Sequence, residues 1–232
     1  MLAKKNKKNK VISPLYVHDN PKSTISEKFR GIRSNIMFSN ANSEIKSLLI
    51  TSEKPSSGKS TVTANIATTY AQAGYKTLII DGDMRKPTQQ YIFDLTNFNG
   101  LSNFIIGKAL SKDAIKETHI ENLSVLTSGP VPPNPSELIT SEKFTELFNK
   151  LSEEFDCILI DTPPVTTVTD AQLYAQNVRD CILIIDITAN DKSEVKKAKE
   201  LLEKSGGKVI GAVLNKATID KGSNYYYYYG DE

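Results

Sequence analysis

The chain has 232 residues, of which 39% are hydrophobic and 24% charged, and its formal net charge is +2. This is enough chain to bury one well-packed α/β domain, and no apolar run approaches the roughly 20 residues that a membrane-spanning helix needs. The two cysteines, Cys157 and Cys181, each begin an apolar strand-like run, which predicts buried thiols rather than a disulfide or a metal site. A cytoplasmic protein is expected, because the basic N-terminus lacks the hydrophobic segment of a signal peptide.

Residues 1–21 are predicted to form a basic, flexible arm. Five lysines crowd its first ten positions: Lys4, Lys5, Lys7, Lys8 and Lys10. Such a run is usually a solvated tail, although an anionic lipid surface attracts it by about 1 kcal/mol per Lys. Nucleic acid is not expected as a partner, because no aromatic residues are interleaved with the lysines.

Residues 22–38 are predicted to form a helix that begins near Ser23 or Thr24. Its apolar stripe consists of Ile25, Phe29, Ile32, Ile36 and Met37. Three charged residues recur at every third position and share another face: Glu27, Arg30 and Arg33. By itself this is an ordinary charged helix surface.

Residues 46–61 combine a short apolar strand with a turn-rich loop that ends in Gly-Lys-Ser-Thr. This is the layout of a phosphate-binding P-loop, in which backbone N–H groups converge on phosphate oxygens, a Lys reaches the β- and γ-phosphates, and a hydroxyl ligates Mg²⁺. The predicted nucleotide-binding residues are Ser56, Ser57, Gly58, Lys59, Ser60 and Thr61. A helix up to Ala73 and a strand at 76–80 complete a βαβ unit whose helix N-terminus faces the phosphate.

Four further short apolar runs are predicted to be strands buried on both faces: 123–126, 157–160, 181–186 and 209–214. Helical patterns lie between them at about 136–152, 169–178 and 191–205, and residues 84–120 are predicted to be loops and short helices. Alternating strands and helices predict an α/β fold with a mostly parallel central sheet and helices on both faces. Residues 22–216 would form this single domain.

Acidic residues directly follow two of the predicted strands. Asp81 and Asp83 come after Leu78-Ile79-Ile80, and Asp161 comes after Ile158-Leu159-Ile160. Because ligands bind beyond the carboxyl ends of parallel strands, these carboxylates are expected beside the P-loop in a Mg²⁺–nucleotide site. The predicted metal ligands are Ser60, Asp81 and Asp161.

Residues 217–232 are predicted to be a flexible, tyrosine-rich tail. Five consecutive phenols follow a Gly-Ser-Asn spacer: Tyr225, Tyr226, Tyr227, Tyr228 and Tyr229. Ten residues separate Asn215 from the first of them, a reach of up to about 35 Å, so the tail could enter its own site or a neighbour's. An adhesive edge-strand segment is the other interpretation.

Taken together, these motifs resemble those of the BY-kinases, a family of bacterial tyrosine kinases, in the form where the kinase and its membrane activator are separate chains. The resemblance covers nearly the whole chain from Glu27 onward. It includes the P-loop, a D-x-D-x-R motif (Asp81, Asp83, Arg85), a D-x-x-P motif (Asp161, Pro164), the E-x-x-R-x-x-R helix and the terminal tyrosines.

The resemblance implies a P-loop NTPase fold of the MinD/ParA-like deviant Walker type that uses ATP and Mg²⁺. It also implies a ring homo-oligomer in which Glu27, Arg30 and Arg33 make subunit contacts and one subunit's tail enters the next subunit's site. The kinase would be recruited to the inner face of the membrane by the cytoplasmic tail of a transmembrane polysaccharide co-polymerase. Its role would be to regulate capsular or extracellular polysaccharide synthesis, with polysaccharide-synthesis enzymes as further substrates.

The predicted reaction transfers the γ-phosphoryl group of ATP to a tyrosine hydroxyl, mainly on another copy's tail. Lys59 would neutralise the β- and γ-phosphates, while Asp81 and Asp161 hold Mg²⁺ directly or through water. Either Asp81 or Asp83 would orient the phenol and accept its proton. The adenine pocket is poorly marked, with Asn215 and Lys216 as its candidates.

Two positions keep other functions open. Glu53 stands where a P-loop usually has its first Gly, and Lys54 falls where MinD- and ParA-like ATPases carry a signature Lys. One alternative is therefore a regulatory ATPase that controls membrane or DNA association, and another is a non-catalytic, nucleotide-gated scaffold. The tyrosine tail discriminates against the ATPase, which has no use for it.

Overall fold

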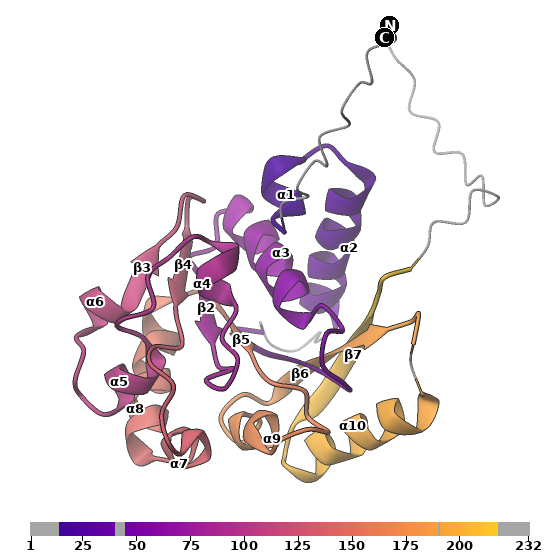
Figure 1. The fold of residues 1–232 in the computed structure, drawn as a ribbon. Helices are drawn as coiled ribbons and strands as arrows, with labels where there is room; N and C mark the ends of the chain where they lie inside the picture. Colours follow the sequence, from indigo (N-terminus) through magenta and orange to yellow (C-terminus); the bar gives the residue numbers. More distant parts are fainter. Residues whose placement is uncertain (1–13, 40–44, 190, 218–232) are drawn as a thin grey trace, which may run out of the picture.

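A computed structural model describes residues 14–39, 45–189 and 191–217 (Figure 1). Most of the predicted arm lies outside the described residues, and so does the tyrosine-rich tail from residue 218 onward, with all five of its consecutive tyrosines. Among the described residues, no helix is both long and apolar enough to cross a membrane.

A seven-stranded sheet forms the centre of the described structure, in the order β3-β4-β2-β5-β1-β6-β7 (Figure 1). The strands are β1 Ser47–Ser52, β2 Thr77–Asp81, β3 Ile115–Glu117, β4 Leu123–Leu126, β5 Cys157–Asp161, β6 Asp180–Asp186 and β7 Lys208–Asn215. All neighbours are parallel except β3, which pairs antiparallel with β4. The prediction of a mostly parallel sheet is confirmed. The sequence analysis missed β3, because three residues are too few to show a period.

Helices cover both faces of this sheet (Figure 1). They are α1 Tyr16–Asp19, α2 Thr24–Phe38, α3 Lys59–Gln72, α4 Gln89–Ile92, α5 Leu101–Ile105, α6 Ser111–Ala114, α7 Pro135–Ile139, α8 Glu142–Glu154, α9 Asp170–Tyr174 and α10 Lys192–Lys204. Alternate strand residues face opposite ways, so Leu49 packs in the cluster with α8 and α9, and Ile50 packs in the cluster with α3. This burial on both faces explains the continuous apolar runs in the sequence.

The domain begins earlier than predicted. Leu15 and Val17, which were expected in the flexible arm, are buried, and the Val17 N–H donates to Asn65 Oδ1 on α3 at 2.9 Å. Residues 14–21 therefore belong to the folded domain, and the predicted boundary at Lys22 is wrong. A four-residue helix such as α1 is too short to be recognised by its periodicity.

The helix predicted at 136–152 is in fact two helices, α7 and α8. Ser141 lies between them in an extended conformation, and its side chain accepts a hydrogen bond from the Phe144 N–H at 3.2 Å. A Ser in this position caps a new helix instead of continuing the old one. The helix predicted at 169–178 is also shorter and ends at Tyr174.

Helix α2 begins as predicted, with Ser23 as its N-cap. Glu27 and Arg30 form an exposed ion pair, whereas the Arg33 guanidinium donates to the Thr69 carbonyl on α3. The three charged residues therefore do not act as one free face, because Arg33 is engaged within its own chain.

Both cysteines are buried, as the sequence predicted, and the structure pairs neither in a disulfide. Burial raises the pKa of Cys181 to about 12, with a further contribution from the charge of Asp180. A raised pKa disfavours the reactive thiolate of Cys181.

Candidate nucleotide-binding and phosphoryl-transfer site

The acidic strand ends are neighbours in the sheet. Strand β5 lies between β1 and β2, and Asp161 at its end pairs in register with Ile50 on one side and with Asp81 on the other. The P-loop leaves the end of β1 at the same edge and leads into α3. The sheet thus gathers the residues that the sequence predicted to lie together.

The P-loop is fastened by the end of β7. Asn215 Nδ2 donates to the Ser57 carbonyl at 2.8 Å, and Lys216 Nζ donates to the Ser56 carbonyl at 2.8 Å. Gly58 adopts a left-handed conformation with φ of 86°, after which α3 begins with its unpaired N–H groups facing the loop. The two proposed adenine-pocket residues therefore contact the backbone of the phosphate-binding loop.

Gly58→Ala is expected to weaken ATP binding at least tenfold. An added Cβ would collide with Asn215 Nδ2, and the left-handed backbone costs a non-glycine residue about 1–2 kcal/mol. Nucleotide affinity measured by calorimetry tests this expectation, with Gly107→Ala as the control, because Gly107 has a similar φ of 75° and open space around it. Equal losses in the two variants would mean that a general effect of strained alanines on the fold, and not the contact with Asn215, is responsible.

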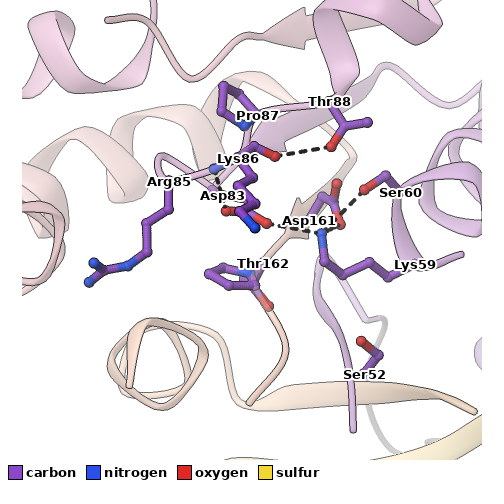
Figure 2. Close-up of polar contacts among 12 residues, drawn as sticks. Ser52, Lys59, Ser60, Asp83, Arg85, Lys86, Pro87, Thr88, Asp161 and Thr162 are labelled. Carbon is purple, nitrogen blue, oxygen red and sulfur yellow. Dashed lines mark hydrogen bonds and ion pairs between the residues drawn. The ribbon is translucent and has the colours of Figure 1, made fainter. Parts of the chain in front are cut away.

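Lys59 lies among the carboxylates, as Figure 2 shows. Its Nζ is 3.2 Å from Asp83 Oδ2, 3.5 Å from Asp161 Oδ1 and 3.3 Å from Ser60 Oγ. Burial opposes the charged form of Lys59, but the charges of Asp161 and Asp83 outweigh it and raise the pKa of the amine. The structure therefore holds a charged ammonium beside the P-loop hydroxyl.

Asp81 is fully buried, and both of its oxygens accept backbone hydrogen bonds. Oδ2 accepts from the N–H groups of Thr88 and Gln89, both at 2.9 Å, and Oδ1 accepts from that of Asp83 at 3.3 Å. Burial and the neighbouring charge of Asp161 raise the pKa of Asp81 to about 7, although the amide hydrogen bonds oppose this shift. Asp81 thus shapes the loop between β2 and α4.

A pocket of about 540 Å³ opens in front of these groups. Its lining comprises Pro55, Ser56, Gly58, Lys59, Ser60, Thr61, Asp83, Arg85, Lys86, Thr88, Pro163, Pro164, Thr167 and Val168. Asp83 lines the pocket; Asp81 and Asp161 do not, although Asp161 contacts the lining residue Lys59 at 3.5 Å. No residue of α2 contributes, so the predicted oligomerisation helix is separate from this site.

Gln89 is a site residue that the sequence analysis missed. Its Nε2 donates to Asp161 Oδ2 at 2.9 Å and to the Ser60 carbonyl at 3.2 Å, and its Oε1 is buried without a hydrogen-bond partner. One amide thus links the strand-end carboxylate to the P-loop helix. Nothing in the sequence around Gln89 indicated this, because the segment reads as an ordinary loop.

Lys54, at the position of the deviant Walker signature, is engaged within its own chain. Its Nζ donates to the Ala189 carbonyl and lies 3.9 Å from Asp186 Oδ2. Asp186 in turn pairs with Lys216 at 2.8 Å. Lys54 thus ties the P-loop to the turn after β6.

The sheet, the P-loop and the convergent carboxylates define a P-loop nucleotide-binding protein of the α/β class. Comparison with known proteins agrees, since residues 45–194 match a family described as an AAA domain. MinD from Pyrococcus horikoshii, solved with Mg-ADP, is 28% identical, with a TM-score of 0.61 over 73% of this chain and 69% of that one.

Closer relatives narrow the class. The CapB protein of Staphylococcus aureus is 72% identical over 97% of this chain and 99% of its own, and tyrosine-protein kinase YwqD of Bacillus subtilis is 39% identical over 98% and 96%. The crystal structure of the chimerical protein CapA2B2 superposes with a TM-score of 0.85 and 57% identity, covering 88% of this chain and 89% of that one. The chain belongs to this family of bacterial tyrosine-protein kinases, as its motifs predicted.

Proposed function

We propose that this chain is an ATP- and Mg²⁺-dependent protein-tyrosine kinase that phosphorylates its own C-terminal tyrosines, mainly between copies. The observation that carries the proposal is the position of Lys59, in contact with both Asp83 and Asp161 beside the P-loop. Phosphoryl transfer depends mostly on positioning and on charge neutralisation, and these groups are placed for both.

The residues present fit a Mg²⁺–nucleotide. The backbone N–H groups of 56–60 and the N-terminus of α3 would receive phosphates, while Ser60 and Asp161, with Asp81 behind them, would hold the metal. No cluster of three or more His, Cys, Asp or Glu side chains suited to a metal occurs in the described parts of the chain. Mg²⁺ keeps several waters and takes one or two carboxylates plus phosphate oxygens, so one hydroxyl and these carboxylates are a donor set that suits it. When bound, Mg²⁺–ATP supplies the phosphoryl group and part of its charge neutralisation.

The role of Asp83 follows from its ion pair. While Asp83 is paired with Lys59 at 3.2 Å, the ammonium balances the charge of the carboxylate and occupies it, so that it is not available to a phenol. When Lys59 instead pairs with phosphates, Asp83 becomes free to orient the acceptor hydroxyl and to receive its proton. A loose transition state asks for little deprotonation of the nucleophile, so a carboxylate suffices.

The chain is also proposed to form a ring homo-oligomer through Glu27, Arg30 and Arg33. Glu27 and Arg30 form an exposed ion pair and are accessible to a neighbouring subunit, while Arg33 would have to leave Thr69 to contribute. The activator would be the cytoplasmic tail of a transmembrane polysaccharide co-polymerase, which would recruit the kinase to the inner membrane face and couple it to capsular or extracellular polysaccharide synthesis. The existence of the CapA2B2 chimera supports a partner of this kind.

Incubation of the purified chain with γ-labelled ATP, with and without the activator's cytoplasmic segment, tests the function. Label is expected on tyrosine, and it should disappear in Lys59→Met and in a variant with all five tail tyrosines changed to Phe. Label that persists in the five-Phe variant would place the acceptor elsewhere. Free phosphate without phosphotyrosine would instead support a regulatory ATPase controlling membrane or DNA association.

A further inference from the structure

We infer that Asp170 and Tyr174 of α9 are positioning residues: they hold the loop that carries Asp83, and so keep Asp83 in place for phosphoryl transfer to a tyrosine. The inference depends on the proposed kinase function. Neither residue lines the pocket, and neither was singled out by the sequence. Together they hold the loop from Gly82 to Arg85 at both of its ends.

The first attachment is a bidentate ion pair at Arg85, the C-terminal end of the loop. Arg85 Nε donates to Asp170 Oδ2 at 2.8 Å, and Nη2 donates to Oδ1 at 2.9 Å. Ser136 of α7 adds a hydroxyl bond to the same carboxylate at 3.1 Å. Asp170 is fully buried, while the Arg85 side chain is 39% exposed. A buried carboxylate without a cation is strongly destabilising, so the fold favours keeping Arg85 in this bidentate pair.

In Figure 2 the Arg85 side chain points away from Lys59 and Asp161. Its guanidinium is bound to Asp170 of α9, although Arg85 also lines the pocket. The bond to α9 explains why an Arg, with its planar fork, stands at the end of the D-x-D-x-R motif.

The second attachment is at Gly82. The Tyr174 hydroxyl donates to the Gly82 carbonyl at 3.3 Å, and burial raises the pKa of Tyr174, so the hydroxyl keeps its proton. A Cβ on Gly82 would lie 2.9 Å from Ile160, 3.0 Å from the Asp161 carbonyl and 3.0 Å from the Tyr174 ring. Gly82 is thus confined between the end of β5 and α9.

Asp83 lies between these two attachments. Its Oδ1 accepts from the Lys86 N–H at 3.0 Å, so its side chain moves with the loop. The P-loop, in contrast, is fastened by hydrogen bonds of Asn215, Lys216 and Lys54, and none of these bonds involves a residue of α9. Loosening α9 should therefore disturb the alignment of the acceptor more than the binding of nucleotide.

The test compares Asp170→Asn and Tyr174→Phe with Glu200→Gln, a carboxylate-to-amide control on the exposed face of α10. Each α9 variant is expected to lower kcat for tyrosine transfer roughly tenfold to hundredfold, with the Kd for Mg²⁺–ATP unchanged within about threefold. Amide hydrogen exchange at residues 82–88 should accelerate in both variants and not in the control. Tyr174→Phe keeps the edge-to-face contact with Phe144 at 5.3 Å, so the fold should survive.

If the α9 variants lost ATP affinity and kcat in parallel, the inference would be overturned. It would also be overturned if amide hydrogen exchange and kcat were both unchanged in these variants. The double variant Asp170→Asn, Arg85→Gln should be no worse than the poorer single variant if the pair acts as a unit. If the wild-type chain does not label tyrosine, the proposed function fails, and hydrogen exchange still decides whether α9 holds this loop.

Discussion

Replacing Asp83 with Asn is expected to slow tyrosine phosphorylation by about 100-fold or more while leaving ATP affinity equal or slightly higher. Asp83 lines the pocket, and within the described ranges its Oδ2 is bound only by Lys59, a group that phosphates would engage instead. Both oxygens of Asp81, in contrast, accept hydrogen bonds from three backbone N–H groups, and Asp81 does not line the pocket. The structure thus separates two carboxylates that the sequence left equivalent.

Single-turnover transfer to the tail, together with the Kd for Mg²⁺–ATP, measures this prediction for Asp83→Asn. Asp94→Asn is a matched control, because Asp94 is exposed, lies outside the pocket and has a positive φ of 54° that Asn tolerates. If Asp83→Asn transferred phosphate at the wild-type rate while Asp81→Asn did not, the acceptor-facing role would belong to Asp81.

The sequence predicted those parts of the site that continuous segments encode. A buried parallel strand appears in the sequence as an apolar run, and the first acidic residue after the run marks its carboxyl end. The P-loop is also a continuous segment, which follows the first of these runs. Asp81, Asp161 and Lys59 could therefore be placed at one sheet edge from the residue pattern alone. The register between β2 and β5, which sets Asp81 directly beside Asp161, is known only from the structure.

Contacts between distant segments could not be predicted in this way. Gln89 lies in a segment predicted only as loops and short helices, and the helical pattern at 169–178 does not indicate what Asp170 and Tyr174 bind. Each of these side chains contacts a segment far away in the chain. Helical spacing also places Arg33 on a face without saying that α3 will accept its hydrogen bond. Local patterns determine which way a residue faces along an element, while its partner depends on packing.

Without Mg²⁺ and nucleotide, the folded protein is expected to lose stability as the pH rises from about 4 to about 7 because of Asp81. Burial and the charge of Asp161 raise its pKa from 3.8 to about 7. Between these two pH values the folded state keeps a proton that the unfolded state has already released, so raising the pH favours unfolding. The shift of about 3 pKa units corresponds to a total cost on the order of 4 kcal/mol, fully present above pH 7 and absent below the unfolded value.

Asp81→Asn removes this titration, so the comparison with wild type isolates it. Asn also leaves one of the backbone donors at Thr88, Gln89 or Asp83 poorly matched, but that penalty is the same at every pH. Denaturant unfolding in EDTA measures the free energy of unfolding at pH 5 and pH 8. Relative to wild type, this free energy should rise in the variant by roughly 2–3 kcal/mol between the two pH values. The exposed control Asp94→Asn should run parallel to wild type. Parallel curves for Asp81→Asn as well would show that Asp81 is already ionised at pH 5, with the charge of Lys59 sufficient to hold all three carboxylates.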